Sequence, residues 1–297
     1  MRIIQISDTH LSGFHDHFAG NAKVFTQSFA GLEPDLFIHT GDISMDGARE
    51  IEDLLLSKRW QDALPAPVLT LPGNHDVGDL ASIRADQPLN DERLSAWRTI
   101  VGPDRWHHVQ DGWSLVGLNA MLLGSGHPDE EAQFEWLETV LETDLPVALF
   151  SHKPLCIDAL DEGPCGYWTV APAPRKRLAA LLEGREVRLI ASGHLHIQRH
   201  KEIDDVSHVW APASSFVVGA AQQDLGGERI LGYAEHVFDG EEVTSRFVRP
   251  DGVEELLLGD HRVAVLVGHL EDHVEGEVAH VGARRQAGGG RHQAERR

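Results

Sequence analysis

The chain has 297 residues, 41% of them hydrophobic, which is enough to bury the core of one large α/β domain or of two smaller domains. Its 26 Lys and Arg against 47 Asp and Glu leave a net charge of −21, and so acidic a surface argues against general nucleic-acid binding. A small anionic substrate would need local positive charge, such as that of a metal ion.

The first half of the chain alternates expected strands with expected helices. Apolar runs predict strands at residues 2–7, 36–40 and 68–71, and helical patterns lie between them at 21–31 and 47–64. Strands that alternate with helices are typical of βαβ units and of a largely parallel sheet. In such sheets, ligands bind beyond the carboxyl ends of the strands.

The second half is richer in expected strands. Apolar runs predict strands at 113–118, 147–150 and 187–191, with amphipathic helices near 131–143 and 174–182. Short segments separated by Gly-rich or Asp-Gly turns, as in antiparallel hairpins, follow at 206–210, 231–238 and 242–248. Together they predict a second sheet packed on the first.

The composition changes near residue 250. Residues 248–297 contain no Phe, Trp or Tyr and end in a Gly-rich and Arg-rich stretch, so they have little with which to build a core. We therefore expect a domain at residues 1–250 and a flexible tail at 251–297. Five of the 19 histidines lie in this tail, so a metal-binding tail is one alternative. The abrupt change of composition makes a non-native reading frame another. With the β-rich region 210–248, the tail could also support a homo-oligomer.

The N-terminus runs directly into an apolar strand pattern without the features of a signal peptide, so we expect a cytoplasmic protein. No apolar run approaches the length needed to cross a bilayer. Cys156 and Cys165 lie close enough in sequence to pair, but in a reducing compartment we expect free thiols.

Five short polar clusters follow the expected strands. They are Asp8-Thr-His10, Gly41-Asp42, Gly73-Asn74-His75-Asp76, Ser151-His152 and Gly193-His194-Leu-His196. Taken singly, most of them have ordinary explanations as a loop cap, a turn or a hydrogen-bonded histidine. Taken together, carboxylates, imidazoles and one carboxamide form a mixed donor set that suits Mn, Fe or Zn. The five clusters therefore predict one metal site.

The ordered set D-x-H, G-D, G-N-H-D, H and G-H-x-H resembles the calcineurin-like dinuclear metallophosphoesterases, over about residues 1–248. The resemblance implies an α/β fold, a two-sheet β-sandwich flanked by helices (α/β/β/α), with two metals at the carboxyl ends of strands. It also implies that Asp8, His10 and His196 hold one metal, that Asn74, His152 and His194 hold the other, and that Asp42 bridges them.

Two such cations would make the protein a metal-dependent phosphoric ester hydrolase. We expect a metal-bound hydroxide to attack phosphorus, while the metals neutralise the developing charge. His75 would stabilise or protonate the leaving oxygen, a role suited to a group that titrates near neutral pH. Asp76 would orient His75, with a solvated turn carboxylate as the alternative.

Two local sequences bear on the substrate. Residues 41–47, Gly-Asp-Ile-Ser-Met-Asp-Gly, lack the arginine that follows G-D in Ser/Thr protein phosphatases, which disfavours a protein phosphatase of that type. Residues 5–11, Gln-Ile-Ser-Asp-Thr-His-Leu, resemble the opening of bacterial class III cyclic-nucleotide phosphodiesterases and related glycerophosphodiesterases. We therefore expect small-molecule phosphodiesters, such as 3′,5′-cyclic nucleotides, as substrates. A phosphomonoesterase of the same fold and a non-catalytic scaffold are the alternatives.

Several other residues are weaker candidates for contact with the substrate. Residues 15–17, His-Asp-His, could touch substrate, although polar loop residues need no such role. Tyr167-Trp168 and residues 210–216 could supply an apolar wall, with core packing as the alternative. His39 is expected to be structural, and residues 107–108, both histidine, to lie on the surface.

Overall fold

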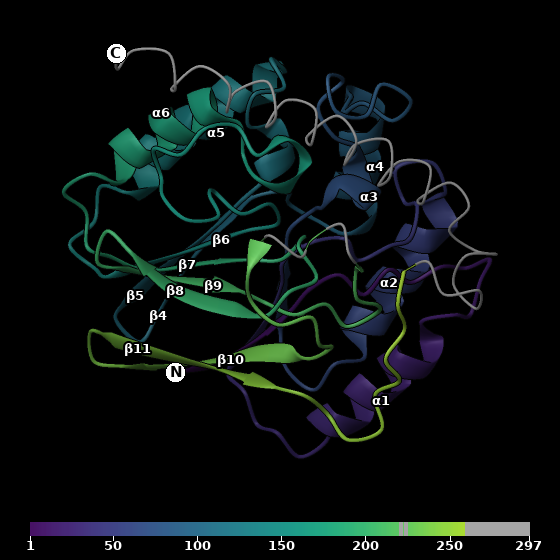
Figure 1. Ribbon diagram of the computed structural model, residues 1–297. Coiled ribbons are helices and arrows are strands. Elements are labelled where there is room, and N and C mark those ends of the chain that lie inside the picture. The colour runs from purple at the N-terminus through teal and green to yellow at the C-terminus, as the bar shows by residue number, and fades with distance from the viewer. Residues whose placement is uncertain (220–221, 223–224, 259–297) are drawn as a thin grey trace, which may run out of the picture.

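The computed structural model describes residues 1–219, 222 and 225–258, which form two stacked sheets covered by helices (Figure 1). The first sheet has the strand order β11 (Glu242–Val248), β10 (Tyr233–Asp239), β1 (Arg2–Ile6), β2 (Leu36–His39) and β3 (Val68–Thr70). The second has the order β4 (Trp106–Gln110), β5 (Trp113–Leu118), β6 (Val147–Ser151), β7 (Val187–Ser192), β9 (Val206–Trp210) and β8 (Arg199–Ile203). The predicted two-sheet architecture is confirmed.

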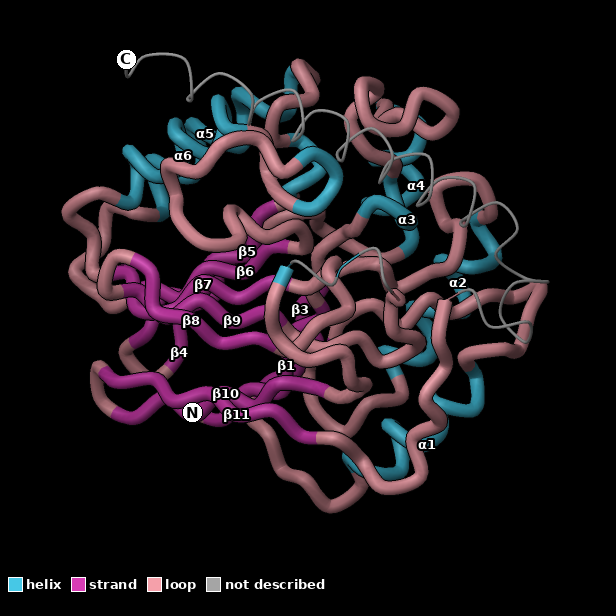
Figure 2. The backbone as a smooth tube through the Cα atoms, viewed as in Figure 1, coloured by secondary structure: helices cyan, strands magenta, loops and turns pink. Residues whose placement is uncertain are grey.

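Both sheets combine parallel and antiparallel strands, with antiparallel pairs at one margin of the first sheet and at both margins of the second. Strands β1, β2 and β3 run parallel, as do β5, β6, β7 and β9, whereas β10 and β11 form an antiparallel margin of the first sheet. Strands β4 and β8 pair antiparallel with β5 and β9. Figure 2 shows the strands of the two sheets as two adjacent layers, with loops gathered at one end. All parallel strands therefore point their carboxyl ends toward one region, as the βαβ pattern predicts.

Alternating side chains on the central strands build the layers. On β1, Ile3 packs between the sheets with Phe150 and Leu189, whereas Ile4 packs on the opposite face with Phe25 of α1 (Ala19–Phe29). This alternation is the period-two pattern of a strand that is buried on both faces. Helix α2 (Ile51–Asp62) covers the first sheet beside α1.

The outer face of the second sheet carries its own helices. They are α4 (Asp91–Ile100), α5 (Pro128–Val140) and α6 (Pro172–Leu182), and Figure 1 shows α5 and α6 lying over this sheet. Trp97, Phe134 and Leu178 from these helices pack in one cluster with Leu149 of β6. The short helix α3 (Asn74–Val77) stands at the end of β3, where it presents the Gly-Asn-His-Asp cluster.

The packed domain extends past the predicted boundary at residue 250. Val253 and Leu256 are buried, and the backbone of Val217 donates to Leu256 O and accepts from Leu258 N. Residues 251–258 are thus part of the domain, and the remainder of the predicted tail, 259–297, lies outside the described residues. Within the described residues, no helix is both long and apolar enough to cross a bilayer.

Candidate metal centre

The predicted ligand clusters all lie just beyond the carboxyl ends of parallel strands. Asp8, Asp42 and Asn74 follow β1, β2 and β3 of one sheet, and His152 follows β6 of the other. His194 and His196 follow β7. The carboxyl ends of the strands of both sheets therefore lie in one place, where residues nearly two hundred positions apart in sequence come together.

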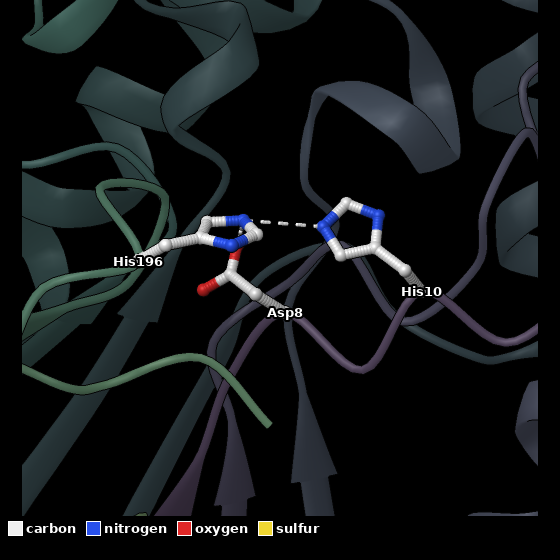
Figure 3. Close-up of side chains that lie close together, drawn as sticks. All are labelled: Asp8, His10 and His196. Atoms are coloured by element: carbon white, nitrogen blue, oxygen red, sulfur yellow. Dashed lines mark hydrogen bonds and ion pairs between the residues drawn. The ribbon is translucent and has the colours of Figure 1, made fainter. Parts of the chain in front are cut away.

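The first group consists of Asp8, His10 and His196, which point toward one another in Figure 3. His196 Nε2 lies 3.4 Å from Asp8 Oδ1 and 3.3 Å from His10 Nε2. All three side chains are buried. Two imidazole nitrogens and a carboxylate oxygen that converge in this way form a donor set that suits a cation.

The second group consists of Asp42, His152 and His194, with Asn74 beside it. His152 Nε2 lies 3.3 Å from Asp42 Oδ2 and 3.2 Å from Asn74 Oδ1. Asp42 Oδ2 also lies 3.7 Å from His10 Nε2, in the first group. Asp42 is thus the carboxylate between the two groups, the position from which one side chain can reach two ions.

Backbone carbonyls set the tautomers of the histidines. His152 Nδ1 donates to Thr40 O at 2.8 Å, His196 Nδ1 to Phe216 O at 2.7 Å, and His194 Nε2 to Tyr167 O at 2.9 Å. In each ring the other nitrogen is the one that is left for a metal ion. Such outer hydrogen bonds hold metal-ligating imidazoles in orientation and raise their basicity.

The electrostatics of the centre favour negative carboxylates. Burial would raise the pKa of Asp8, but His196 outweighs burial and lowers that pKa below its ordinary value. Burial also opposes ionisation of Asp42, whose pKa is nevertheless lowered, chiefly by His152. Conversely, the Asp42 carboxylate overcomes burial to raise the pKa of His152 to about 9. A proton held between these two groups occupies the place that a cation would take, so metal binding releases it.

One buried atom supports the interpretation that the site suits a cation. Asp8 Oδ1 has no hydrogen-bond partner among the residues that the structure describes, although it is fully enclosed. Unpartnered buried polar atoms are rare and call for an explanation such as a missing ion. The donor set of oxygen and nitrogen atoms fits the expected transition metals.

The loops that carry the candidate ligands leave the extended backbone of the strands. Asp8 and His10 come after β1 has ended, and both have left-handed φ angles, 55° and 46°. Asp42, His194 and His196 share this conformation, with φ of 50°, 69° and 52°. The side chains of Asp8 and His10 therefore converge through tight turns rather than through strand pleating.

Two glycines allow these turns to approach one another. Gly41 has a φ of 97°, and a Cβ there would lie 2.7 Å from His152 Nδ1. A Cβ on Gly73 would lie 2.8 Å from Asp42 Cγ. Gly41 thus lets its turn approach His152, and Gly73 leaves room for the Asp42 carboxylate.

His75 stands at the edge of the centre, with its ring edge-on to His10 at a centroid distance of 4.6 Å. Its Nδ1 donates to Met45 O at 2.6 Å, which leaves Nε2 as the free ring nitrogen. Burial lowers the pKa of His75, and the Asp42 carboxylate opposes this effect. We expected Asp76 to orient the His75 ring, but in the structure the Met45 carbonyl does so.

The Asp76 carboxylate forms hydrogen bonds with two loops of the centre. Its buried carboxylate accepts hydrogen bonds from Ile43 N, Ser44 N, Ser44 Oγ and Gly73 N, at 2.5–3.2 Å. Burial and the nearby Asp42 raise its pKa to about 7. Asp76 is therefore neither solvated nor aimed at the His75 ring, and it fastens the loop of Asp42 to the loop of Asn74.

The expected apolar wall is only partly present. Tyr167, Trp168 and Phe216 line the pocket at the centre, and Phe216 lies 4.4 Å from the His196 ring. Trp210 instead packs in a core cluster with Cys156 and Ile197. Sequence reasoning missed the pocket residues Val218, Gln222 and Leu258, which carry no motif.

The remaining expectations have mixed outcomes. His39 is structural, as expected, because its Nε2 contacts Thr9 Oγ1 at 3.1 Å and burial lowers its pKa to about 3. His15 and Asp16 are exposed and are not among the pocket residues. Cys156 is a free thiol, as expected. A buried ion pair between Lys153 and Asp79, at 2.8 Å, was not predicted.

Known proteins resemble this chain in sequence. It is 30% identical over 246 residues to a cAMP/cGMP dual specificity phosphodiesterase of Mycobacterium tuberculosis, covering 76% of this chain and 71% of the relative. It is 27% identical to a probable glycerophosphodiester phosphodiesterase of Arcobacter nitrofigilis (66% and 72%). It is also 25% identical to a protein of Pongo abelii named as a serine/threonine-protein phosphatase (75% and 70%).

Solved structures share the fold at low sequence identity. A dimetal phosphatase from Danio rerio superimposes with a TM-score of 0.55 at 14% identity, covering 83% of this chain and 95% of the other. GAP50, described as an anchor in the inner membrane complex of Plasmodium, superimposes with a TM-score of 0.61 at 17% identity (89% and 92%). The profile of the calcineurin-like phosphoesterases matches residues 1–198, and the chain belongs to this family of metal-dependent phosphoester hydrolases.

Proposed function

We propose that this protein hydrolyses small phosphodiesters, such as 3′,5′-cyclic nucleotides, with the help of two transition-metal ions. The observation that carries the proposal is the position of Asp42, within 3.3 Å of His152 in one ligand group and 3.7 Å of His10 in the other. A single carboxylate shared by two ligand groups suits a dinuclear centre. Mn, Fe and Zn all accept this set of oxygen and nitrogen donors.

The residues divide into ligands and a proton donor. Asp8, His10 and His196 would hold one ion, Asn74, His152 and His194 the other, and Asp42 both. When bound, such a metal pair supplies an activated water and polarises the phosphoryl oxygen. His75 also lies close to His10 and Asp42, and the proposal assigns it the role of proton donor rather than that of a ligand.

His75 acts on the leaving oxygen. The Met45 carbonyl accepts from Nδ1 whether or not Nε2 is protonated, so the ring keeps its orientation through the proton transfer. Burial lowers the pKa of His75, which makes its proton easier to give up. The imidazolium donates from Nε2 to the departing oxygen, and the ring returns to its neutral tautomer.

Phosphodiesters are favoured over other esters by two observations. Two of the three relatives described above are named as phosphodiesterases. In addition, no arginine stands in residues 41–47, beside the bridging Asp42. The relative named as a protein phosphatase keeps phosphoserine peptides among the substrates to be tested.

The proposal is tested by a substrate panel assayed with Mn²⁺. It contains cyclic AMP, a glycerophosphodiester, 4-nitrophenyl phosphate and a phosphoserine peptide. Turnover of the diesters supports the proposal, and turnover of the monoester or the peptide alone overturns it. Protein that binds no transition metal by elemental analysis would instead indicate a scaffold.

Two substitutions assign the roles. Asp42→Ala removes a ligand from both groups, so we expect loss of bound metal and of activity, whereas Asp62→Ala, an exposed change on α2, leaves both unaffected. His75→Ala should keep the metal and lower kcat by about 10²–10⁴-fold, the range for loss of a general acid. Unchanged turnover in either active-site variant would contradict the assignment.

The proposal includes a cytoplasmic location, since Cys156 is a free thiol of the kind that reducing compartments maintain. Cell fractionation checks the location. Self-association through residues 210–248 stays a prediction that size-exclusion chromatography with light scattering checks.

A further inference from the structure

The side chain of Gln222 is the most unusual polar group in the pocket at the metal centre. Only 1% of the residue is exposed, yet neither Nε2 nor Oε1 has a hydrogen-bond partner among the described residues. Gln222 lines the same pocket as Asp42, His75 and His194. Burying an amide without partners costs free energy, so the pocket holds this group at the expense of stability. Such a group calls for an explanation in function.

Gln222 shares the pocket with apolar residues. Phe216, Val218 and Leu258 line the pocket with it, and Phe216 also contacts the ring of His10 at a centroid distance of 5.0 Å. Tyr167 and Trp168 line the pocket near His194, to which their rings lie at 4.6 Å and 6.4 Å. The candidate metal ligands thus line one part of the pocket, and aromatic residues line another. The Gln222 amide is a polar group of this pocket without a hydrogen-bond partner among the described residues.

We propose that Gln222 binds the organic group of the substrate and selects a purine carrying an exocyclic amino group. The inference rests on the proposed phosphodiesterase function, which places the phosphate at the metal ligands. A carboxamide presents one donor and one acceptor side by side, and this pair matches the amino group and ring nitrogen of adenine. Aromatic walls beside it suit a flat heterocycle. Gln222 is therefore a specificity residue, and it takes no part in the chemical step.

Three phosphodiesters separate this role from a structural one. Cyclic AMP carries both partners for the amide, the 3′,5′-cyclic monophosphate of purine riboside lacks the amino group, and bis(4-nitrophenyl) phosphate has no purine. Gln222→Leu should raise KM for cyclic AMP on the order of tenfold, as expected for loss of neutral hydrogen bonds, with kcat little changed. The variant should match the wild type on bis(4-nitrophenyl) phosphate.

The wild-type protein supplies a measurement that needs no variant. Its KM for the analogue without the amino group should exceed that for cyclic AMP several-fold, and Gln222→Leu should abolish this difference. Gln222→Glu, which removes the amide donor and keeps two acceptors, should also raise KM for cyclic AMP. Gln27→Leu, an exposed change on α1, is the matched control and should behave as the wild type.

Each outcome decides the proposal. Equal loss on cyclic AMP and on bis(4-nitrophenyl) phosphate would show that Gln222 only supports the fold, and an unchanged KM for cyclic AMP would show that it makes no contact. If the wild type turns over no diester, the proposed function fails. Calorimetric binding of cyclic AMP to Mn²⁺-loaded protein still decides the role of Gln222: a roughly tenfold weaker Kd in Gln222→Leu supports it, and an equal Kd or no binding overturns it.

Discussion

Replacing Asp76 by alanine separates a role in holding the ligand loops from a role in orienting His75. Its carboxylate accepts from the backbone of Ile43, Ser44 and Gly73, and in alanine these buried donors have no acceptor. Each orphaned donor costs about 1–3 kcal/mol. We therefore expect Asp76→Ala to lower the free energy of unfolding by at least about 3 kcal/mol. The loops of Asp42 and Asn74 also lose their common anchor, so metal affinity should fall by about 10–100-fold, as for other outer-shell changes.

Urea unfolding and elemental analysis of the dialysed protein measure the two effects. Asp76→Asn serves as the milder variant, because its amide oxygen still accepts while its NH₂ group faces donors. It should therefore fall between the wild type and Asp76→Ala in both measurements. His75→Ala is the contrast, since it should keep stability and metal while losing kcat. If Asp76→Ala instead keeps full stability and metal content and loses only kcat, the positioning argument is wrong and a catalytic role for Asp76 is restored.

Two further predictions test the packing around the site and the fold. Gly73→Ala would place a Cβ 2.8 Å from Asp42 Cγ, so the Asp42 carboxylate must move. We expect Mn²⁺ affinity measured by calorimetry to fall about 10–100-fold, and an unchanged affinity would show that the loop shifts without cost. Burial lowers the pKa of His236 to about 3, below the ordinary 6.5. As the pH falls, this histidine is therefore protonated in the unfolded protein before it is protonated in the folded protein. Stability that is complete above pH 6.5 is therefore lost toward pH 3, by about 2 kcal/mol between pH 7 and pH 5 from this residue. His236→Gln should remove that part of the pH dependence in urea unfolding at the two pH values, and an equal slope would refute the linkage.

Buried elements of the fold were predictable because their patterns are strong. The apolar runs that form β5, β6 and β7 appear within one residue of the expected bounds, since strands buried on both faces need continuous hydrophobic sequence. Strands β4 and β8 were missed because they lie at sheet edges and carry mostly polar residues. Helix α4 was missed despite a usable signal: the Asn90 side chain accepts from Arg93 N at 2.9 Å as its N-cap.

The site was predictable as far as its motifs reach. The candidate ligands could be recognised because residues with oxygen and nitrogen donors recur directly after strands. A parallel sheet brings the carboxyl ends of its strands, and therefore these residues, to one edge. The anchors of the histidines were not predictable, since Thr40, Met45, Tyr167 and Phe216 act through backbone carbonyls that any residue could supply. Gln222 has no motif either, and its significance appears only from its burial without partners.

The conformation of the ligand loops explains why this centre needs so large a fold. Five ligand residues, none of them glycine, hold left-handed φ angles, each at a cost of roughly 1–2 kcal/mol. Backbone hydrogen bonds between the loops oppose this strain, with Asp8 N donating to Gly41 O at 3.0 Å and His10 N to Asp42 O at 3.1 Å. These bonds continue the β1–β2 pairing beyond the strands, so the sheets, rather than the metals, hold the turns in place. The candidate ligands are therefore held by backbone contacts of the fold, which is the preorganisation that a site for two closely spaced cations needs.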